Sequence, residues 1–394
     1  MSEKDYDSDS SSGDEEQTTA LDIVVTKYNM GADIVNAVLR ELLARAKDGQ
    51  SIGQLIDDGD QMLQERTAKL FKKDKKMKKG IAFPTCVSVN NCICHYSPLK
   101  SEPDKLLKDG DVVKIDLGVH IDGFIATAAH TIVVGASKEN KIKGRVADAM
   151  LGAYNALEAA IRMLRPEQKN KNMDITETIS KVADAFHVKP VENMLSHQLK
   201  RHKIDGEKQI IQAPGEKERS TLEKCEFEEH DVFAIDILFS TGEGKAREGD
   251  QRTTVYKKAD DLIYQLKMKM SRAFLTEAEK KFGVHPFSLR RFEDEAKAKM
   301  GVGECERHGL MKPYQVLWER EGEVVVQFKA TVLVMPTGLL KITGLPLETG
   351  LYESENKITD PKLSLLIASS LKPKNKKKAK AKESKEKEAA ETKA

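Results

Sequence analysis

The stretch "KIDLGVHIDGFIATAAH", residues 114–130, constrains the fold of this chain most strongly. Its central Asp122-Gly123 is a dipeptide favoured in two-residue hairpin turns, and apolar residues flank it on both sides. The resulting register makes Asp116 and Thr127 diagonal neighbours on one face of two paired strands. Because a carboxylate on an apolar strand face needs a partner, we expect Asp116 to face a site.

A second stretch repeats this pattern about 120 residues later. "DGDVVKIDLG" holds Asp111 and Asp116, and "EEHDVFAIDIL" holds Asp231 and Asp236 at the same spacing. Two αβ halves that each turn a carboxylate into a shared cleft would produce this repeat, and chance similarity of two apolar strands is the alternative. Together with His197, the candidate site has fewer ligands than a hydrolytic two-metal site needs.

The remaining apolar periodicity predicts a mixture of helices and strands. Alternating and continuous apolar runs predict strands in "EFEEHDVFAIDILFSTGEG" and "EVVVQFKATVLVMP". The order predicts an α+β domain over residues 19–361, with a helical insert near residues 258–310. Helical spacing of apolar side chains occurs within residues 34–42, 63–77, 146–164 and 175–186.

The two ends of the sequence carry opposite charge. Residues 1–16 hold seven acidic side chains and one lysine, whereas residues 372–394 hold ten lysines and four glutamates. We expect a disordered acidic arm over residues 1–18, because "SDSSSGDEE" has no apolar side chain to bury. Residues 362–394 are predicted to form a short helix and a disordered lysine-rich tail. No apolar run reaches the length that spans a bilayer, so we expect no membrane insertion.

The five cysteines are scattered along the chain, which is typical of a protein in a reducing compartment. Cys92, Cys94 and the adjacent His95 resemble half of a zinc site, but no second pair of ligands completes it. We therefore expect no bound cofactor.

Lysines are the candidate RNA-binding residues, because dense positive charge binds phosphates through counterion release. Lys69, Lys72, Lys73 and Lys76 recur at helical spacing and predict a basic helical face. Few aromatic residues accompany them, which favours recognition of folded RNA by shape and backbone. A solubilising helix, a solvated tail and a nuclear-localisation signal are the alternatives. The remaining candidates are Lys75, Lys78 and Lys79, and in the tail Lys372, Lys374, Lys376, Lys377, Lys378, Lys380 and Lys382.

Two short motifs carry weaker signals. Leu363, Leu366 and Ile367 resemble an LxxLL-like helical face that docks into a partner's groove, and packing on the chain's own domain is the alternative. Residues 10–12 are serines that precede "GDEE", a pattern typical of sites for an acid-directed kinase.

Several segments, in order, resemble the strands of a type II methionine aminopeptidase across residues 20–360. They are "GIAFPTCVSVNNCICHYSP", "VVKIDLGVHIDGFI", "MLSHQL", "FAIDILFSTGEGK" and "QFKATVLVMP". The resemblance implies the pita-bread fold, in which two related αβ halves surround a dimetal cleft. It also favours the interpretation that the internal repeat comes from two related αβ halves over chance similarity of two strands.

The same resemblance places the five metal-ligand positions of those enzymes on Asp116, Thr127, His197, Asp236 and Lys329. Only Asp116 and His197 keep the enzyme's residue type. Thr127 offers a neutral hydroxyl where a bridging carboxylate is required, and Lys329 places an ammonium where a carboxylate would bridge two cations.

Two further cleft positions follow from the resemblance. His95 matches a cleft histidine of the enzymes, whereas Asp205 stands where they have another. The resemblance therefore implies a degenerate site with no catalytic residues and no bound metal, and an active metal-dependent methionine aminopeptidase is the alternative.

These departures resemble a non-enzymatic branch, the proliferation-associated, ErbB-receptor-binding proteins. "FKKDKKMKKGIAFPT", "MLSHQLKRHKIDGEK", "STGEGKAREGDQRTTVYK" and "PFSLRRFEDE" carry that resemblance. It implies binding to structured RNA, including rRNA, and to the large ribosomal subunit, with roles in ribosome biogenesis, translational control and growth regulation. Receptor tails and transcriptional regulators are implied partners, and the implied location is cytoplasmic and nuclear or nucleolar. A protein–protein adaptor without RNA contact is the alternative.

Overall fold

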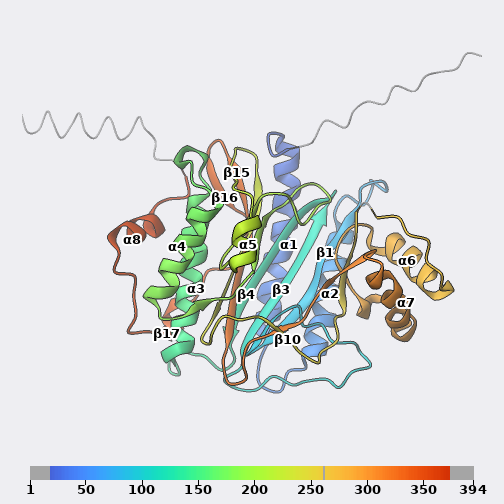
Figure 1. The fold of residues 1–394 in the computed structure, drawn as a ribbon, viewed down its shortest axis with the longest axis horizontal. Coiled ribbons are helices and arrows are strands. Elements are labelled where there is room, and N and C mark those ends of the chain that lie inside the picture. Colours follow the sequence, from blue (N-terminus) through green and yellow to red (C-terminus); the bar gives the residue numbers. More distant parts are fainter. Residues whose placement is uncertain (1–17, 261, 373–394) are drawn as a thin grey trace, which may run out of the picture.

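A nine-stranded sheet forms the centre of the computed structural model, which describes residues 18–260 and 262–372 (Figure 1). Two short strands extend the sheet, with β16 (Gly338–Lys341) paired to β15 and β6 (Lys189–Pro190) paired to β9. The main strands follow the order β1 (Lys79–Val89), β3 (Val112–Ile121), β4 (Phe124–Val133), β15 (Val325–Met335), β9 (Val232–Ser240), β7 (Leu195–Gln198) and β8 (Gln209–Ile211).

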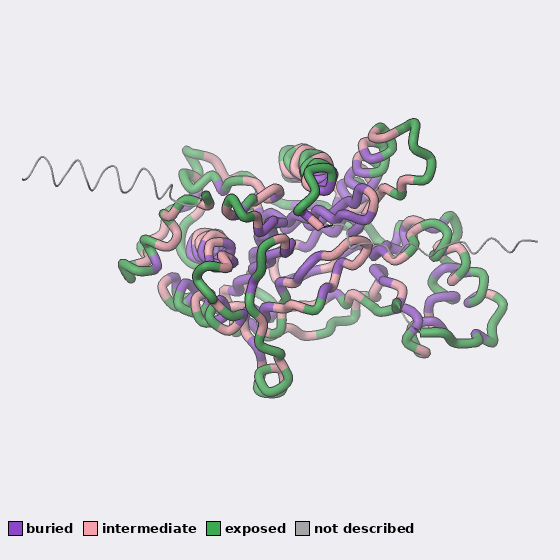
Figure 2. The backbone as a smooth tube through the Cα atoms, turned by 90° about the horizontal axis from the view of Figure 1, so that it is seen from above, coloured by how far each residue is buried: buried purple, intermediate pink, exposed green. Residues whose placement is uncertain are grey.

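Two pairs of helices cover the two halves of this sheet. The first half buries α1 (Asp22–Arg45) and α2 (Ile52–Lys69) against β3 and β4 in one apolar cluster. The second half buries α3 (Gly144–Met163) and α4 (Asn172–Ala185) against β9 and β15 in another. Figure 2 shows the buried backbone in the middle of the molecule, with exposed segments around it. The predicted α+β pita-bread fold is confirmed.

The register of the central hairpin agrees with the prediction from its turn. Asp122 and Gly123 adopt φ angles of 55° and 82°, so both lie in the left-handed region that a two-residue turn requires. Ile121 then pairs with Phe124, and Asp116 pairs with Ala129. A local turn therefore sets which face of β3 carries the Asp116 carboxylate.

Helices α6 (Lys269–Phe282) and α7 (Glu295–Arg307) lie beyond the β1 edge of the sheet (Figure 1). Phe274, Phe287 and Phe292 form the centre of their own apolar cluster, joined by Tyr256 from the adjoining small sheet. That three-stranded sheet has the order β12 (Phe287–Ser288), β11 (Val255–Lys258) and β13 (Met311–Tyr314).

The remaining elements are short. They are β2 (Cys92–Cys94), β14 (Leu317–Trp318) and β10 (Arg247–Glu248) in one small sheet, the pair β5 (Ile142–Lys143) and β17 (Tyr352–Glu353), the helices α5 (Glu216–Thr221) and α8 (Pro361–Ala368), and the 3-10 turns Pro166–Gln168, Leu289–Arg291 and Thr349–Leu351. No helix among the described residues has both the length and the apolar character that a bilayer crossing requires.

The predicted helix through residues 63–77 is wrong beyond Lys69, where α2 ends. Phe71 adopts a φ of 41°, which no α-helix accommodates, and the Asp74 carboxylate accepts hydrogen bonds from the backbone N–H groups of Lys76 and Met77. Such local side-chain bonds compete with helical ones. Lys72, Lys73, Lys75, Lys76 and Lys78 therefore lie in a loop, and the predicted basic helical face does not exist.

The predicted partner-docking face of α8 is wrong for its first leucine. Leu363 is buried in the apolar cluster of α3, and Leu366 and Ile367 pack partly against the same cluster. Leu365 is the apolar side chain that α8 exposes. The alternative, in which α8 packs on its own domain, is what the structure has.

Candidate functional site

A cavity of about 340 Å³ opens at the centre of the sheet, where β15 lies between β4 and β9. Phe83, Leu238 and Tyr314 belong to its apolar walls, so the cavity draws on both halves of the sheet and on the small sheet next to the insert. Its polar lining includes Thr127, His95, His197, Asp205, Asp236 and Lys329. Six of the seven residues that the resemblance singled out therefore lie around one space, and Asp116 lies directly beside it.

Four residues form one row across four adjacent strands behind this cavity. Asp116 on β3 pairs with Ala129 on β4, and Ala129 pairs with Lys329 on β15. Lys329 in turn pairs with Asp236 on β9. Directly paired residues project from the same face of a sheet, so the three charged side chains of this row converge. The small side chain of Ala129 leaves Lys329 room to reach Asp116.

Lys329 forms an ion pair with both carboxylates of the row. Its Nζ lies 2.6 Å from Asp116 Oδ2 and 3.0 Å from Asp236 Oδ2, and all three side chains are nearly excluded from solvent. The amide of Gln327 donates to both carboxylate oxygens of Asp236 at 3.0 Å. Two carboxylates and one ammonium therefore occupy the position that the resemblance assigns to metal ions.

The protonation of this cluster follows from burial and charge. Burial lowers the pKa of Lys329, but the two adjacent carboxylates outweigh it, so the pKa of this lysine lies above its ordinary value. Burial raises the pKa of Asp116 and of Asp236 more than the single shared ammonium lowers it. Lys329 therefore stays charged, and the cluster carries a net negative charge when both carboxylates are ionised.

Thr127 and His197 complete the inner wall without entering the ion cluster. The Thr127 N–H donates to Thr331 Oγ1 at 2.9 Å, and its carbonyl accepts from the hydroxyls of Thr331 and Thr343. Its own hydroxyl and the Nδ1 of His197 have no hydrogen-bond partner among the described residues. Burial lowers the pKa of His197, so its imidazole is neutral near pH 7.

His95 and Asp205 also line the cavity, and each has a partner outside the ion cluster. His95 Nδ1 lies 3.0 Å from the Gln315 carbonyl, and burial lowers the pKa of His95 to about 4. Asp205 forms an ion pair with Lys257, whose Nζ lies 2.5 Å from its Oδ1.

This donor set does not fit two divalent ions. Lys329 Nζ stands between the carboxylates that would have to bind a cation, and like charges repel in a buried site. Burial raises the pKa of Cys94 and raises that of Cys92 to about 11, so the half zinc site presents protonated thiols, which bind metals poorly. Within residues 18–260 and 262–372, no group of three His, Cys, Asp or Glu side chains is arranged to hold a metal ion.

The candidate RNA-binding lysines divide into two sets. Lys69, Lys72, Lys73, Lys75, Lys76 and Lys78 are all exposed, at the end of α2 and in the loop that follows. Lys79 differs, because its ammonium hydrogen-bonds the carbonyl of Leu70. In the tail, Lys372 is exposed, and the remaining predicted lysines, from Lys374 to Lys382, lie outside the described residues.

The structure adds a basic turn that the list of candidate lysines missed. The backbone of Lys78 accepts a hydrogen bond from the N–H of Asp122, and Arg201 donates two hydrogen bonds to the same aspartate. The loop after α2 and the turn Lys200–Lys203 therefore flank one hairpin. The run "KRHK" at residues 200–203 was the available signal. Lys200 and Lys203 both pair with Glu207, so this turn is partly neutralised.

Comparison with known protein families gives a match over most of the sheet. Residues 27–261 match the model of metallopeptidase family M24. "Proliferation-associated protein A" of Dictyostelium discoideum is 45% identical over 352 residues, which cover 89% of each chain. "ErbB-3 binding protein 1" of Arabidopsis thaliana is 44% identical over 92% of this chain and 91% of its own. "Methionine aminopeptidase 2" of Laccaria bicolor is 27% identical over 85% of this chain and 89% of its own.

Solved structures agree with these matches. A thermophilic Arx1 has a TM-score of 0.83 at 30% identity and covers 90% of this chain and 100% of its own. A methionine aminopeptidase from Thermotoga maritima has a TM-score of 0.54 at 18% identity, covers 83% of this chain and 99% of its own, and shares the fold alone.

Proposed function

Because this chain belongs to metallopeptidase family M24 and, within it, to the proliferation-associated or ErbB-3-binding proteins, we propose that it is an RNA- and ribosome-binding protein without peptidase activity. One observation carries the second half of this proposal. The Nζ of Lys329 lies between Asp116 and Asp236, at the position that the resemblance to methionine aminopeptidases assigns to metal ions.

The ion cluster supports the loss of peptide hydrolysis on chemical grounds. A dimetal hydrolase needs anionic ligands that bridge two cations and lower the pKa of a bound water. Here the two remaining carboxylates are both paired with one internal ammonium, and Thr127 supplies a neutral hydroxyl. Nothing in this arrangement activates a water molecule for attack on a peptide bond.

The exposed lysines support binding to RNA. Lys69 to Lys78 contribute six exposed ammonium groups within ten residues, and none of them has a carboxylate within ion-pair distance among the described residues. A loop of this kind binds phosphate oxygens without reading sequence, which suits rRNA on a ribosomal surface. The lysine-rich tail supplies a second site of the same chemistry.

The proposal extends to where the protein acts. An RNA-binding member of this family would act in ribosome biogenesis and translational control, and so in growth regulation, in the nucleus or nucleolus and in the cytoplasm. The name of the Arabidopsis relative records binding to ErbB-3, which favours receptor tails as protein partners, with transcriptional regulators as a further class. A protein adaptor without RNA contact is therefore the second candidate function.

Co-sedimentation with purified large ribosomal subunits separates these functions. We expect the full chain to sediment with the subunit at low salt and to be released when the subunit is treated with nuclease. An adaptor would stay bound to the protein remnant after nuclease. Release of methionine from a Met-Gly-Met peptide in the presence of Mn²⁺ or Co²⁺ would overturn the non-enzymatic part of the proposal.

A further inference from the structure

Large apolar side chains are exposed on the helical insert, where α6 and α7 lie at the edge of the molecule (Figure 1). Ile263 is 98% exposed, more than any other large apolar side chain among residues 18–260 and 262–372. The Glu304 carboxylate accepts a hydrogen bond from the N–H of the exposed Met268, and the exposed Met300 lies one helical turn before Glu304 on α7. Exposed apolar side chains that gather in this way mark interaction surfaces. The other members of the group are Leu262 and Tyr264.

The segment that precedes α6 alternates between buried and exposed side chains, as a β-strand with one covered face does. The ring of Tyr264 stacks on that of His308, with centroids 3.9 Å apart and an angle of 15° between the planes. Leu266, two residues later, is 3% exposed and belongs to the apolar cluster of the insert. The intervening Ile263 and Gln265 are exposed. One face of this segment is therefore fixed to the insert, and the other face is open.

The backbone of the same segment lacks the hydrogen bonds of a sheet. Residues 262–265 belong to no helix or strand and form no hydrogen bond with any other described residue. At the end of the segment, by contrast, the Glu304 carboxylate accepts hydrogen bonds from the N–H groups of Lys267 and Met268, at 2.8 Å and 3.1 Å. An extended segment with free N–H and C=O groups is a template to which a second strand can add. Because its inner face is already fixed, little ordering is needed when a partner binds.

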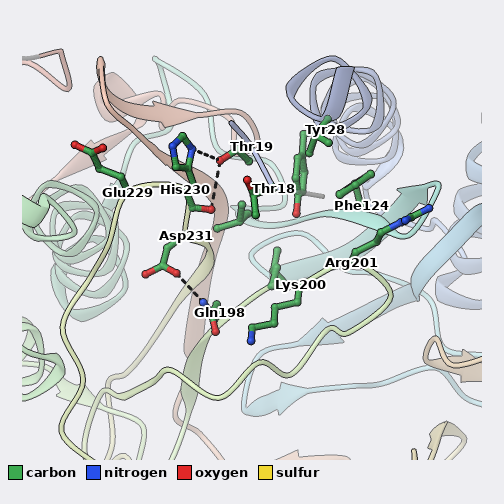
Figure 3. Close-up of a pocket in the computed structure, with 13 residues that line it drawn as sticks. Thr18, Thr19, Tyr28, Phe124, Gln198, Lys200, Arg201, Glu229, His230 and Asp231 are labelled. Atoms are coloured by element: carbon green, nitrogen blue, oxygen red, sulfur yellow. Dashed lines mark hydrogen bonds between the residues drawn. The ribbon is translucent and has the colours of Figure 1, made fainter. Parts of the chain in front are cut away.

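The cations around this segment are available to a partner, unlike those of other surfaces. In the pocket beside Thr18, Lys200 lies 2.8 Å from Glu207, and Arg201 lies 3.0 Å from Asp122, so both charges are already paired (Figure 3). On the insert, four exposed cations have no carboxylate within ion-pair distance among the described residues. These cations are Lys267, Lys269, Lys299 and Arg307.

A groove on the surface of α6 continues this positive charge. Lys269, Arg272 and Lys280 line it, and its one acidic side chain, Glu277, is paired with Lys281 at 2.6 Å. The surface that follows residues 262–268 onto α6 is therefore cationic, and it complements a partner that carries carboxylates.

We propose that residues 262–268 are a docking strand for an extended, acidic and apolar segment of a partner protein. The partner strand pairs with the free backbone groups, covers Ile263 with an apolar side chain, and places its carboxylates beside Lys267 and Lys269. A lipid bilayer would leave the N–H and C=O groups unpaired in hydrocarbon, and a second copy of this surface would bring like charges together. RNA would pair with the lysines but leave Ile263 uncovered. This docking does not rest on the proposed RNA binding.

Peptide binding to the full chain tests the proposal. The probe is a fluorescent peptide that repeats Asp-Val-Glu-Ile, and the control peptide has Lys in place of each acid. At about 50 mM salt, we expect the acidic peptide to bind at least about ten-fold more tightly and to slow hydrogen exchange of the amides of residues 262–266. Alternate N–H groups of a strand point to opposite edges. N-methylation of either all acidic or all apolar residues of the peptide should therefore abolish binding in one set and spare it in the other.

Variants of the chain locate the contact. Ile263→Ser should weaken binding of the acidic peptide about ten-fold, whereas Leu365→Ser, at the 71% exposed leucine of α8, should leave it unchanged. Lys267→Gln together with Lys269→Gln should weaken it about three-fold at low salt. Equal binding by Ile263→Ser and the unaltered chain, or no slowing of exchange in residues 262–266 at about 1 mM peptide, would overturn the proposal. So would slowing by phosphatidylserine vesicles or by an RNA duplex but not by the peptide, since the partner would then be lipid or RNA.

Discussion

The ammonium of Lys329 lies 2.6 Å from the Oδ2 of Asp116, and this ion pair joins β15 to β3 across the small side chain of Ala129. Asp236 holds the same ammonium from the other side at 3.0 Å. An internal cation thus joins the two halves of the sheet at the position that the resemblance to methionine aminopeptidases assigns to metal ions. Several measurable properties depend on this arrangement.

Replacement of Lys329 should destabilise the fold. The Lys329→Ala variant leaves Asp116 and Asp236 buried beside one another without a cation, and loss of one partner of a buried pair costs about 3–5 kcal/mol. Urea denaturation measures the change in the free energy of unfolding. The matched control is Lys181→Ala, at an exposed lysine of α4. Equal stability of both variants would mean that the Lys329 charge is solvated.

Metal binding should depend on the same lysine. We expect no stoichiometric Mn, Co or Zn in the purified protein, as measured by elemental analysis. The triple variant Thr127→Asp, Asp236→Glu and Lys329→Glu restores the carboxylates that the resemblance assigns to a dimetal centre, and should bind divalent metal. Methionine release should stay well below that of an active enzyme, because Asp205 stands in place of a cleft histidine and pairs with Lys257. Two metal ions per unmodified chain would contradict the prediction that the purified protein binds no stoichiometric metal.

A stack of buried histidines should make the protein sensitive to acid. The rings of His120 and His285 lie 3.9 Å apart, and both nitrogens of His285 lack a hydrogen-bond partner among the described residues. Burial, reinforced by neighbouring histidines and by Lys78, lowers the pKa of His120 to about 2 and that of His285 to about 3. In the unfolded chain these rings become protonated near pH 6.5. The contribution of the buried, neutral rings to the free energy of unfolding is therefore fully present above that pH.

Stability should therefore fall between about pH 6.5 and pH 3, by about 1.4 kcal/mol per pH unit for each of these histidines. His285→Phe keeps a flat ring in the stack and removes one titrating group, so the slope of unfolding free energy against pH should decrease. His187→Phe, at an exposed histidine, is the control. An unchanged slope in His285→Phe would show that His285 does not contribute to the acid sensitivity.

The salt dependence of RNA binding should report the loop after α2. Changing Lys72, Lys73, Lys75 and Lys76 to Gln removes four exposed charges, so the slope of log affinity against log salt should flatten by about 0.9 for each phosphate lost on duplex RNA. Deletion of residues 373–394 should flatten it further, roughly additively. The matched control changes four exposed lysines on the other half of the domain, Lys138, Lys141, Lys169 and Lys181. If both quadruple variants flatten the salt slope equally, the loop lysines act only through the overall positive charge of the protein and not through a specific contact.

Helix α8 should act as part of the core. Leu363 is 6% exposed and Leu365 is 71% exposed, so Leu363→Ala should cost about 2–4 kcal/mol, whereas Leu365→Ala should cost less than about 0.5 kcal/mol. Thermal denaturation of both variants gives the comparison. A larger loss for Leu365→Ala would mean that α8 packs through its other face.

The sequence by itself determined what local geometry and composition control. The turn at Asp122-Gly123 set the register of β3 and β4, because a two-residue turn permits only one pairing of its flanking strands. The resemblance then placed Asp116, Asp236 and Lys329 in one cleft. The helix predicted through Lys72 from the spacing of lysines was wrong. Exposed lysines do not pack, so their spacing carries no information about a core.

Only the tertiary structure decided how distant segments meet. Lys329 and Asp116 are 213 residues apart, and their contact depends on β4 lying between β3 and β15. The apolar spacing of Leu363, Leu366 and Ile367 is the same whether α8 docks into a partner or packs on α3. Only the position of α3 in the fold distinguishes these two arrangements. A strand pairing is a long-range choice among apolar segments of similar composition, so no local pattern encodes it.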